Sequence, residues 1–257
     1  MSRTLFDHIA IGMPRMADAP EILAGVLGGM PEHGRPSGVF RWGTWRFAGG
    51  GCIEIIEPMG VDGFLHRFLA RRGPGIHHVT FKVPRLDEAC QRARACGYTP
   101  VGHDDSDPSW KEAFLHPKQA LGIVVQVVEV NRTLHAAKPR WPVPAGPESP
   151  PPPVTLLGLR LRAHSRQRAL TQWETILAGE CTEDSIGALI FHWPGSPMRI
   201  AVEIDAAGDE GPIAIEVESE RRLALPDGPH PALGTVFSQG SLPADAPGAL
   251  DTSSRRA

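Results

Sequence analysis

The chain of 257 residues is long enough for one large or two small folded domains with a substantial core. Its formal net charge is −3, from 26 Lys and Arg against 29 Asp and Glu, and no run of adjacent basic residues exceeds two. This balance excludes nucleic acid and anionic membranes as expected partners. No apolar stretch is long enough to span a bilayer, and the N-terminus shows no basic-then-apolar leader, so we expect a cytoplasmic protein.

Taken in chain order, residues 4–57 predict a β-α-β-β-β unit from the change between helical and alternating hydrophobic periodicity. Its expected elements are a strand at 4–12, a helix from Met16 to about Gly28, a loop at 31–37, short strands at 39–42 and 44–47 that turn at Gly43, and a strand at 52–57. After a short amphipathic helix around 64–69, a second unit repeats this order. Its elements are a strand at 75–83, a helix at 87–97 and strands at 113–116 and 123–130.

The two units form an internal repeat, which is the strongest fold signal in the sequence. The first strand of each unit carries one histidine at a constant offset of seventy residues, and the last strand of each carries one Glu or Gln at nearly the same offset. The two pairs are His8 with His78 and Glu54 with Gln126. Strand alternation predicts that all four side chains point to the same inner face of the sheet.

The same alternation separates the neighbours of His78. Thr80 and Lys82 share its polar face, whereas His77 belongs to the opposite face, where we expect it to pack against its neighbours or to support a ligand without binding the metal. A single strand histidine is more often a hydrogen-bonded structural residue than a ligand. Two imidazoles, a carboxylate and an amide at equivalent places instead favour a divalent metal ion, which could be zinc, cobalt, nickel, manganese or iron.

The second half of the chain is predicted to be a degenerate repeat of the first. Residues 136–153 are dense in proline and predict a stiff linker. Residues 154–237 predict a degenerate third unit and part of a fourth, in which Leu159, Val202 and Ala214 are expected at the ligand positions. Residues 238–257 read as a disordered tail. The four cysteines show no CxxC or disulfide pattern, so we expect reduced, mostly buried thiols.

Several motifs resemble the vicinal oxygen chelate (glyoxalase/bleomycin resistance/dioxygenase) superfamily, and within it the methylmalonyl-CoA epimerase family, over residues 4–130. They are Asp7-His8-Ile9-Ala10-Ile11, Glu54-Ile55-Ile56-Glu57-Pro58, Gly75-Ile76-His77-His78-Val79-Thr80-Phe81 and Phe114-Leu115-His116-Pro117-Lys118. The resemblance implies an α+β fold, in which tandem βαβββ modules in residues 1–135 form a curved mixed sheet around a metal cup. It also implies one divalent metal ion held by His8, Glu54, His78 and Gln126.

By the same resemblance, the metal holds two adjacent substrate oxygens and stabilises the enolate that forms when a base removes an α-proton. This chain departs from the epimerase pattern because its Glu and Gln are exchanged between the two last strands. Gln126 cannot accept a proton at neutral pH, so the base is hypothesised to be Glu54. No acidic residue lies between Glu32 and Glu54, and a one-base site suits an isomerase or lyase of the glyoxalase type, or an oxygenase, at least as well as an epimerase.

Other side chains are candidates for substrate binding. Lys82 and Arg46 could bind a carboxylate or phosphate, with ordinary surface charge as the alternative. Trp42, Trp45 and Phe114 could wall the pocket, with core packing as the alternative. Thr80 is a further candidate because it shares the face of His78.

The sequence therefore predicts a metal-dependent isomerase, epimerase or glyoxalase-type lyase acting on a small carboxylic or acyl-thioester substrate. The alternatives are an extradiol-type dioxygenase and a metal-free small-molecule binding or resistance protein. We expect a monomer or homodimer, with the degenerate modules packed on the first domain where a second subunit sits in smaller relatives.

Overall fold

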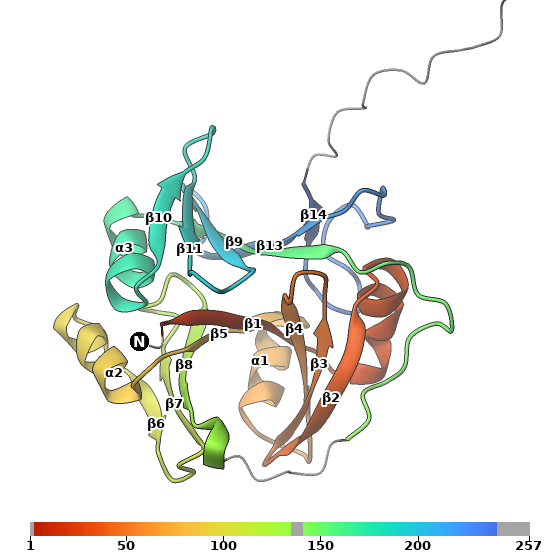
Figure 1. Cartoon of the computed structure of the whole chain (residues 1–257), viewed down its shortest axis with the longest axis horizontal. Coiled ribbons are helices and arrows are strands. Elements are labelled where there is room, and N and C mark those ends of the chain that lie inside the picture. The colour runs from red at the N-terminus through yellow and green to blue at the C-terminus, as the bar shows by residue number, and fades with distance from the viewer. Residues whose placement is uncertain (1–2, 135–140, 241–257) are drawn as a thin grey trace, which may run out of the picture.

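The computed structural model describes residues 3–134 and 141–240, and their strands form two sheets (Figure 1). The first sheet has eight strands in the order β2-β3-β4-β1-β5-β8-β7-β6. These are β1 (Leu5–Gly12), β2 (Met30–Ser37), β3 (Phe40–Arg46), β4 (Cys52–Pro58), β5 (Gly75–Lys82), β6 (Val101–Asp104), β7 (Trp110–Leu115) and β8 (Val124–Val130). The helices beside it are η1 (Met16–Asp18), η2 (Glu21–Val26), α1 (Phe64–Arg72), α2 (Leu86–Ala95) and η3 (Arg132–Leu134).

Pairing register confirms the predicted repeat. Each module places its first strand parallel to its last, and the two first strands join the modules in antiparallel fashion. Ala10 on β1 lies beside Glu54 on β4, and at the equivalent place Thr80 on β5 lies beside Gln126 on β8. The last strands, β4 and β8, therefore flank the central β1–β5 pair of the curved sheet.

The predicted loop at 31–37 and the predicted turn at Gly43 are wrong. Residues 30–37 form β2, and Gly43 lies in the middle of β3, while the hairpin turns at Gly38, whose φ is +62°. Two prolines in β2 hid the strand, but β2 is the edge of the sheet, where proline costs no ladder hydrogen bond. A Cβ at Gly34 would lie 2.1 Å from the Trp42 carbonyl oxygen, so the close approach of β2 to β3 at this point requires glycine.

The second sheet contains six strands in the order β10-β11-β12-β9-β13-β14. They are β9 (Thr155–Ala163), β10 (Glu180–Glu183), β11 (Leu189–His192), β12 (Arg199–Ile204), β13 (Gly211–Glu218) and β14 (Phe237–Gln239), with helices α3 (Arg166–Leu170) and η4 (Thr171–Ile176). β9 to β12 make the third module, and β13 and β14 repeat the first and last strands of a fourth. β14 runs across the expected start of the tail at 238, and residues 135–140 and 241–257 lie outside the described residues.

The ligand positions of the first sheet are lost in the second. Matching register shifts align β1 with β9 and β5 with β13, so the counterparts of His8, Glu54, His78 and Gln126 are Gly158, Ala201, Ala214 and Ser238. The sequence expectation of Leu159 and Val202 is wrong by one residue, because β9 follows β1 at a constant offset of 150 residues, whereas the expectation placed Leu159 at an offset of 151 from His8. Instead, Arg160 fills this face and bonds Glu203 and Glu216 at 3.0 and 2.8 Å.

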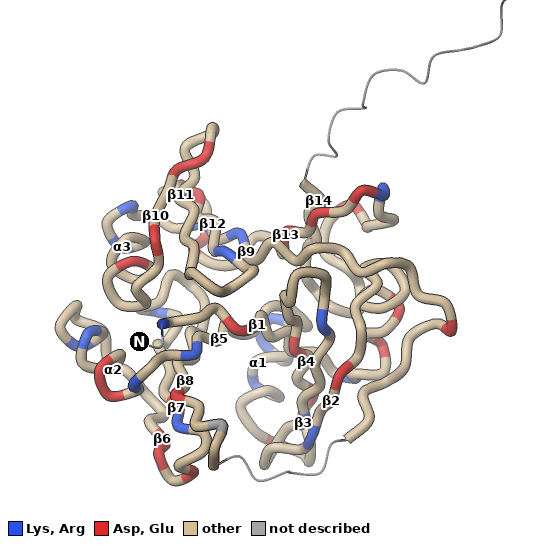
Figure 2. Tube along the Cα trace, viewed as in Figure 1, with Lys and Arg blue, Asp and Glu red and all other residues tan. Residues whose placement is uncertain are grey.

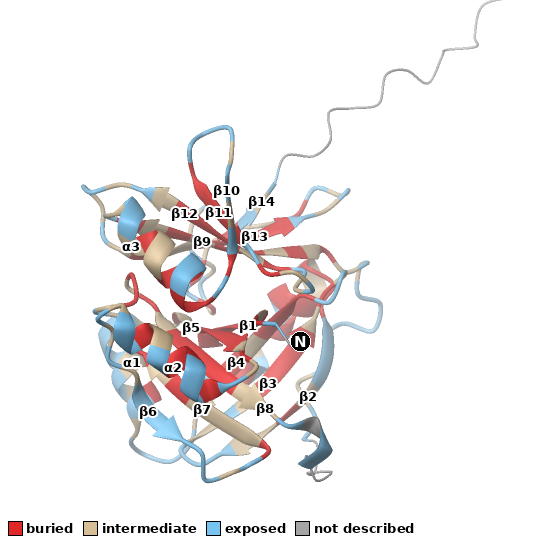
Figure 3. Ribbon diagram, turned by 60° about the vertical axis from the view of Figure 1, so that its left-hand side comes forward, coloured by how far each residue is buried: buried red, intermediate tan, exposed pale blue. Residues whose placement is uncertain are grey.

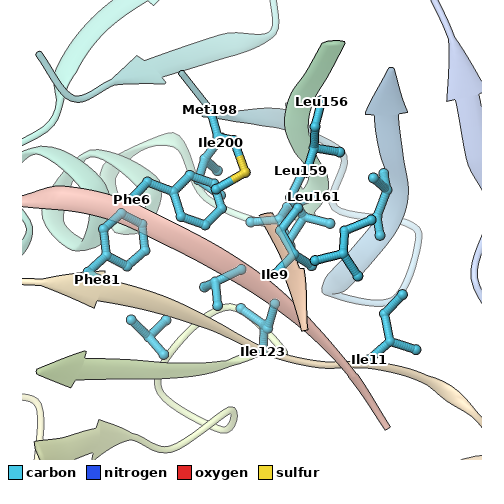
Figure 4. Close-up of a cluster of buried hydrophobic side chains, with 14 of the residues drawn as sticks. Phe6, Ile9, Ile11, Phe81, Ile123, Leu156, Leu159, Leu161, Met198 and Ile200 are labelled. Carbon is cyan, nitrogen blue, oxygen red and sulfur yellow. The ribbon is translucent and has the colours of Figure 1, made fainter. Parts of the chain in front are cut away.

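The core lies between the two sheets. Phe6 and Phe81 stack at 4.8 Å on the first sheet, and Phe81 meets Trp193 of the third module at 4.6 Å. Figure 4 shows Phe6, Phe81 and the β1 isoleucines facing Leu156, Leu159, Leu161, Met198 and Ile200 across this interface. In Figure 3 the buried segments concentrate in the central strands, whereas the loops and outer helix faces are exposed. The other face of the first sheet is therefore free to form a cup.

Within the described residues, no helix is both long and apolar enough to cross a membrane.

Candidate metal centre

Three of the predicted ligands meet on the cup face of the first sheet. One ligand atom from each of His8, Glu54 and His78 lies within 4.8 Å of the other two, and His8 Nε2 is 3.6 Å from Glu54 Oε1. The two histidines are buried and Glu54 is nearly so. Atoms bound to one ion at about 2.0–2.2 Å lie up to about 4.4 Å apart, so this set fits a single divalent ion after small side-chain movements. Two nitrogens and one oxygen are donors that several transition metals accept.

A bulge in β1 supplies a partner for His8. The β1–β5 register shifts between Phe6 and His8, so Asp7 is the extra residue. Asp7 Oδ2 lies 3.0 Å from His8 Nδ1, and Asp7 Oδ1 accepts a hydrogen bond from Lys82 Nζ at 2.5 Å. A carboxylate on one ring nitrogen fixes the imidazole and directs Nε2 toward the cluster, which is a common support for metal-binding histidines.

The three cluster residues have different proton affinities. Burial lowers the pKa of His8, but the charges of Glu54 and Asp7 and the Asp7 hydrogen bond outweigh burial and raise it. Burial raises the pKa of Glu54, although the His8 charge opposes this. Burial and the charges of His77 and His8 hold the pKa of His78 well below its usual range. The lowered pKa therefore favours a neutral His78, whereas the raised pKa of His8 makes a metal ion compete with a proton for that ring.

Gln126 connects to the cluster through Thr80. Thr80 Oγ1 donates to Gln126 Oε1 at 2.6 Å and lies 2.9 Å from His8 Nε2. Gln126 Nε2 donates to Glu112 Oε2 at 2.7 Å, and Trp110 Nε1 donates to the same oxygen at 2.9 Å. With its nitrogen committed to Glu112, the Gln126 amide presents its oxygen toward the cluster. The second lone pair of that oxygen stays available for an ion.

Sequence reasoning missed Glu112 as a residue of the site. The predicted strand began at 113, but β7 begins at Trp110, so Glu112 lies within it. Glu112 and Phe114 share a face, and Phe114 lies opposite Gln126 in the β7–β8 register. The alternation of Trp110, Glu112 and Phe114 was the available signal.

His77 lies closer to the centre than strand alternation predicts. The β1–β5 register skips His77 at its second shift, and His77 Nδ1 is 2.9 Å from His78 Nδ1. The rings of Phe64 and Phe68 from α1 pack on His77 at 5.4 and 4.9 Å. Burial lowers the pKa of His77 to about 4, so it holds the His78 ring as a neutral imidazole.

The expected substrate-binding residues have different positions. Thr80 is 0% exposed, and its hydroxyl is bonded within the site rather than open to the cup. Trp45 is also 0% exposed and belongs to the hydrophobic core, since β3 turns Trp42, Thr44 and Arg46 to the other face. The expectation that Trp45 walls the pocket is therefore wrong.

The remaining candidates lie on or near the cup face. Trp42 packs against His33 with ring centroids 5.4 Å apart, and Phe114 stands beside Gln126. Arg46 pairs with Glu32 at 2.9 Å and Lys82 with Asp7. Both cations are thus already neutralised, and neither is a free anion-binding group.

The paired modules, the single curved sheet and the His-Glu-His cluster define a protein of the vicinal oxygen chelate class. The model of the Glyoxalase/Bleomycin resistance protein/Dioxygenase superfamily matches residues 7–114. An uncharacterized protein of Bacillus subtilis (strain 168), YqjC, is 30% identical over 135 residues, which are 50% of this chain and 94% of that protein. The chain belongs to this superfamily.

Two solved structures extend the comparison. Methylmalonyl-CoA epimerase from Mycobacterium tuberculosis has 27% identity and a TM-score of 0.46, over 50% of this chain and 89% of that chain. A mutant of 4-hydroxymandelate synthase from Streptomyces coelicolor has 14% identity and a TM-score of 0.58, over 86% of this chain and 72% of that chain. The second match shows a shared fold over most of this chain.

Proposed function

We propose that this protein is a metal-dependent isomerase, epimerase or glyoxalase-type lyase that acts on a small carboxylic or acyl-thioester substrate. The observation that carries the proposal is the meeting of His8, Glu54 and His78 within 4.8 Å on the floor of the cup. Gln126 is the fourth proposed ligand. A divalent ion bound there would supply Lewis-acid stabilisation of negative charge that develops on substrate oxygens.

The chain's own residues support proton abstraction from the substrate. Glu54 is the proposed base, and its burial raises its pKa above the ordinary range for a carboxylic acid. A raised pKa brings a carboxylate closer to the operating pH and makes it a better proton acceptor. Asp7 and Thr80 hold His8, and His77 holds His78, so the two imidazoles are fixed before substrate arrives.

A second candidate is an extradiol-type dioxygenase. Two histidines and one carboxylate with further open positions form the ligand set of many non-haem iron oxygenases. The cluster of His8, Glu54 and His78 has this composition without Gln126, whose oxygen already accepts a hydrogen bond from Thr80. A third candidate, metal-free sequestration of a small molecule, is disfavoured by the intact donor set.

Metal analysis and proton exchange together test these proposals. Purified protein should contain about one divalent ion per chain, and His8→Ala with His78→Ala should remove it. The isomerase or lyase proposal expects the loaded protein to exchange an α-proton of short acyl-thioesters or 2-oxo acids with deuterium from solvent. Oxygen uptake with catechols and an iron content would favour the dioxygenase, and absence of any metal would reject both enzymes.

A further inference from the structure

A basic cleft lies next to the candidate metal centre. It has a volume of about 630 Å³, within the usual range for small-molecule sites. α1 forms one wall and the turn that follows β7 forms the other. Phe64, Phe68, Ile76 and Val124 contribute apolar surface to it.

Four cations from these two walls surround the cleft. They are Arg67, Arg71 and Arg72 on α1 and Lys118 on the opposite turn. Figure 2 shows Lys and Arg segments along α1. Among the described residues, none of the four side chains has an ion pair or a hydrogen bond to an acid.

Among the described residues that line the cleft, the one acid is Glu210, and its carboxylate already has partners. Glu210 accepts two hydrogen bonds from Arg168 Nη1, at 2.7 and 2.9 Å, and a third from the His164 backbone N–H. Isolated surface arginines on a helix are ordinarily just solvated. Here four cations that lack an acidic partner in the described part of the chain face one cleft from two elements. The one described carboxylate that lines it is neutralised by Arg168, so the cleft has a net positive potential.

The cleft reaches the metal centre through its inner wall. His77 lines the cleft and contacts His78 through the two Nδ1 atoms at 2.9 Å. Val124 also lines it and is the strand partner of His78. A molecule in the cleft therefore lies one residue away from the candidate ligands.

We propose that this cleft binds a phosphate-bearing part of the substrate, attached to the reacting end by an apolar segment. The inference rests on the proposed function for placing the reacting end at His8, Glu54 and His78. One guanidinium group can donate two parallel hydrogen bonds to two oxygens of a phosphate. An arginine-rich rim is therefore better suited to phosphate than to a neutral group. The apolar surface contributed by Phe68 and Val124 accommodates the connecting carbon atoms.

Calorimetric titration of the full chain with butyl phosphate and with inorganic phosphate at low salt tests the proposal. Butyl phosphate should bind several-fold more tightly than inorganic phosphate, and its binding should weaken as salt rises. Arg67→Gln with Lys118→Gln, one change on each wall, should weaken butyl phosphate at least tenfold. The matched control is Arg3→Gln with Arg94→Gln, which removes two exposed arginines outside the cleft and should bind as the unchanged protein does.

Equal binding of the two anions would show a free-phosphate site and overturn the proposal, as would unchanged binding in the cleft variant. No binding by the unchanged protein would overturn it as well. Metal content of each variant is measured in parallel. If the protein binds butyl phosphate but contains no metal, the proposed function is rejected and the cleft assignment stands. If it contains metal but does not bind butyl phosphate, the cleft assignment is rejected and the proposed function stands.

Discussion

Gln126 donates its side-chain N–H to Glu112 at 2.7 Å, from one strand of the second module to the next. This contact decides which end of the amide faces His8 and Thr80. Since only the oxygen can ligate an ion, Glu112 acts on the candidate site through Gln126 and is a positioning residue.

Replacement of Glu112 should therefore weaken metal binding without removing a ligand. We expect Glu112→Leu to lower metal affinity about tenfold or more, the size of effect usual for outer-shell partners. Glu112→Gln can still accept the hydrogen bond through its carbonyl and should lose much less. Competition with a chelator of known affinity measures both. If Glu112→Leu binds metal normally, Gln126 is not a ligand held by this contact.

Glu54 has two proposed roles, and the amide variant separates them. Glu54→Gln keeps an oxygen donor but cannot accept a proton, so metal content should persist while proton exchange falls about 10²–10⁴-fold. Gln126→Ala should mainly weaken metal binding. Full exchange activity in metal-loaded Glu54→Gln would refute Glu54 as the base.

Thr80 should be important for stability as well as for the site. Its hydroxyl is fully buried between Gln126 and His8, so Thr80→Val leaves both groups short of a partner at a cost of about 1–3 kcal/mol. Thr80→Ser retains the hydroxyl and should lose less. Urea unfolding of the metal-free protein compares the two variants. A Thr80→Ser protein less stable than Thr80→Val would mean that the methyl group, rather than the hydroxyl, supplies the stabilisation.

Asp7 makes the metal-free protein sensitive to acid. Burial raises the pKa of Asp7, but its hydrogen bonds and charge pairing with His8 and Lys82 outweigh burial and lower the pKa below its ordinary value of 3.8. The folded state therefore favours the charged carboxylate. The resulting stability is complete above the unfolded pKa and is lost as pH falls through 3.8 toward the folded value.

The variant Asp7→Asn removes this contribution. It should be less stable than the unchanged protein by about 1–2 kcal/mol between pH 5 and 7, and the difference should shrink below about pH 4. Urea midpoints across that range give the comparison. A difference that grows with acidity would mean that the Asp7 carboxylate is not the group responsible.

The first sheet and the meeting of three candidate ligands followed from the sequence because the repeat is visible in residue identity. His8 and His78 share an offset, and strand alternation fixed their face. Features that depend on pairing were not visible. Pro31 and Pro36 made an edge strand look like a loop. The bulge at Asp7 was not visible because a bulge is defined by how two strands pair, and the local sequence does not show that pairing. Trp45 was misplaced because the predicted turn at Gly43 broke a strand whose alternation would have sent it to the core.

The degenerate modules should be needed for the stability of the first sheet. Trp193 is buried between Trp173 and the stacked rings of Phe6 and Phe81, and Ser196 Oγ donates to the Phe6 carbonyl at 2.7 Å. Loss of the Trp193 ring should leave a cavity that both sheets line. We expect Trp193→Ala to destabilise the protein by about 3–5 kcal/mol, against less than about 0.5 kcal/mol for Trp141→Ala, whose side chain is half exposed.

The same packing predicts how the protein unfolds. Because one core joins the sheets, urea should unfold both in a single transition, and metal release should coincide with loss of tryptophan fluorescence. A fragment of residues 1–135 would expose Phe6 and Phe81 and should associate or aggregate. Two separate transitions in the full chain, or a stable and active monomeric fragment, would show instead that the cup folds independently of the modules that cover its back.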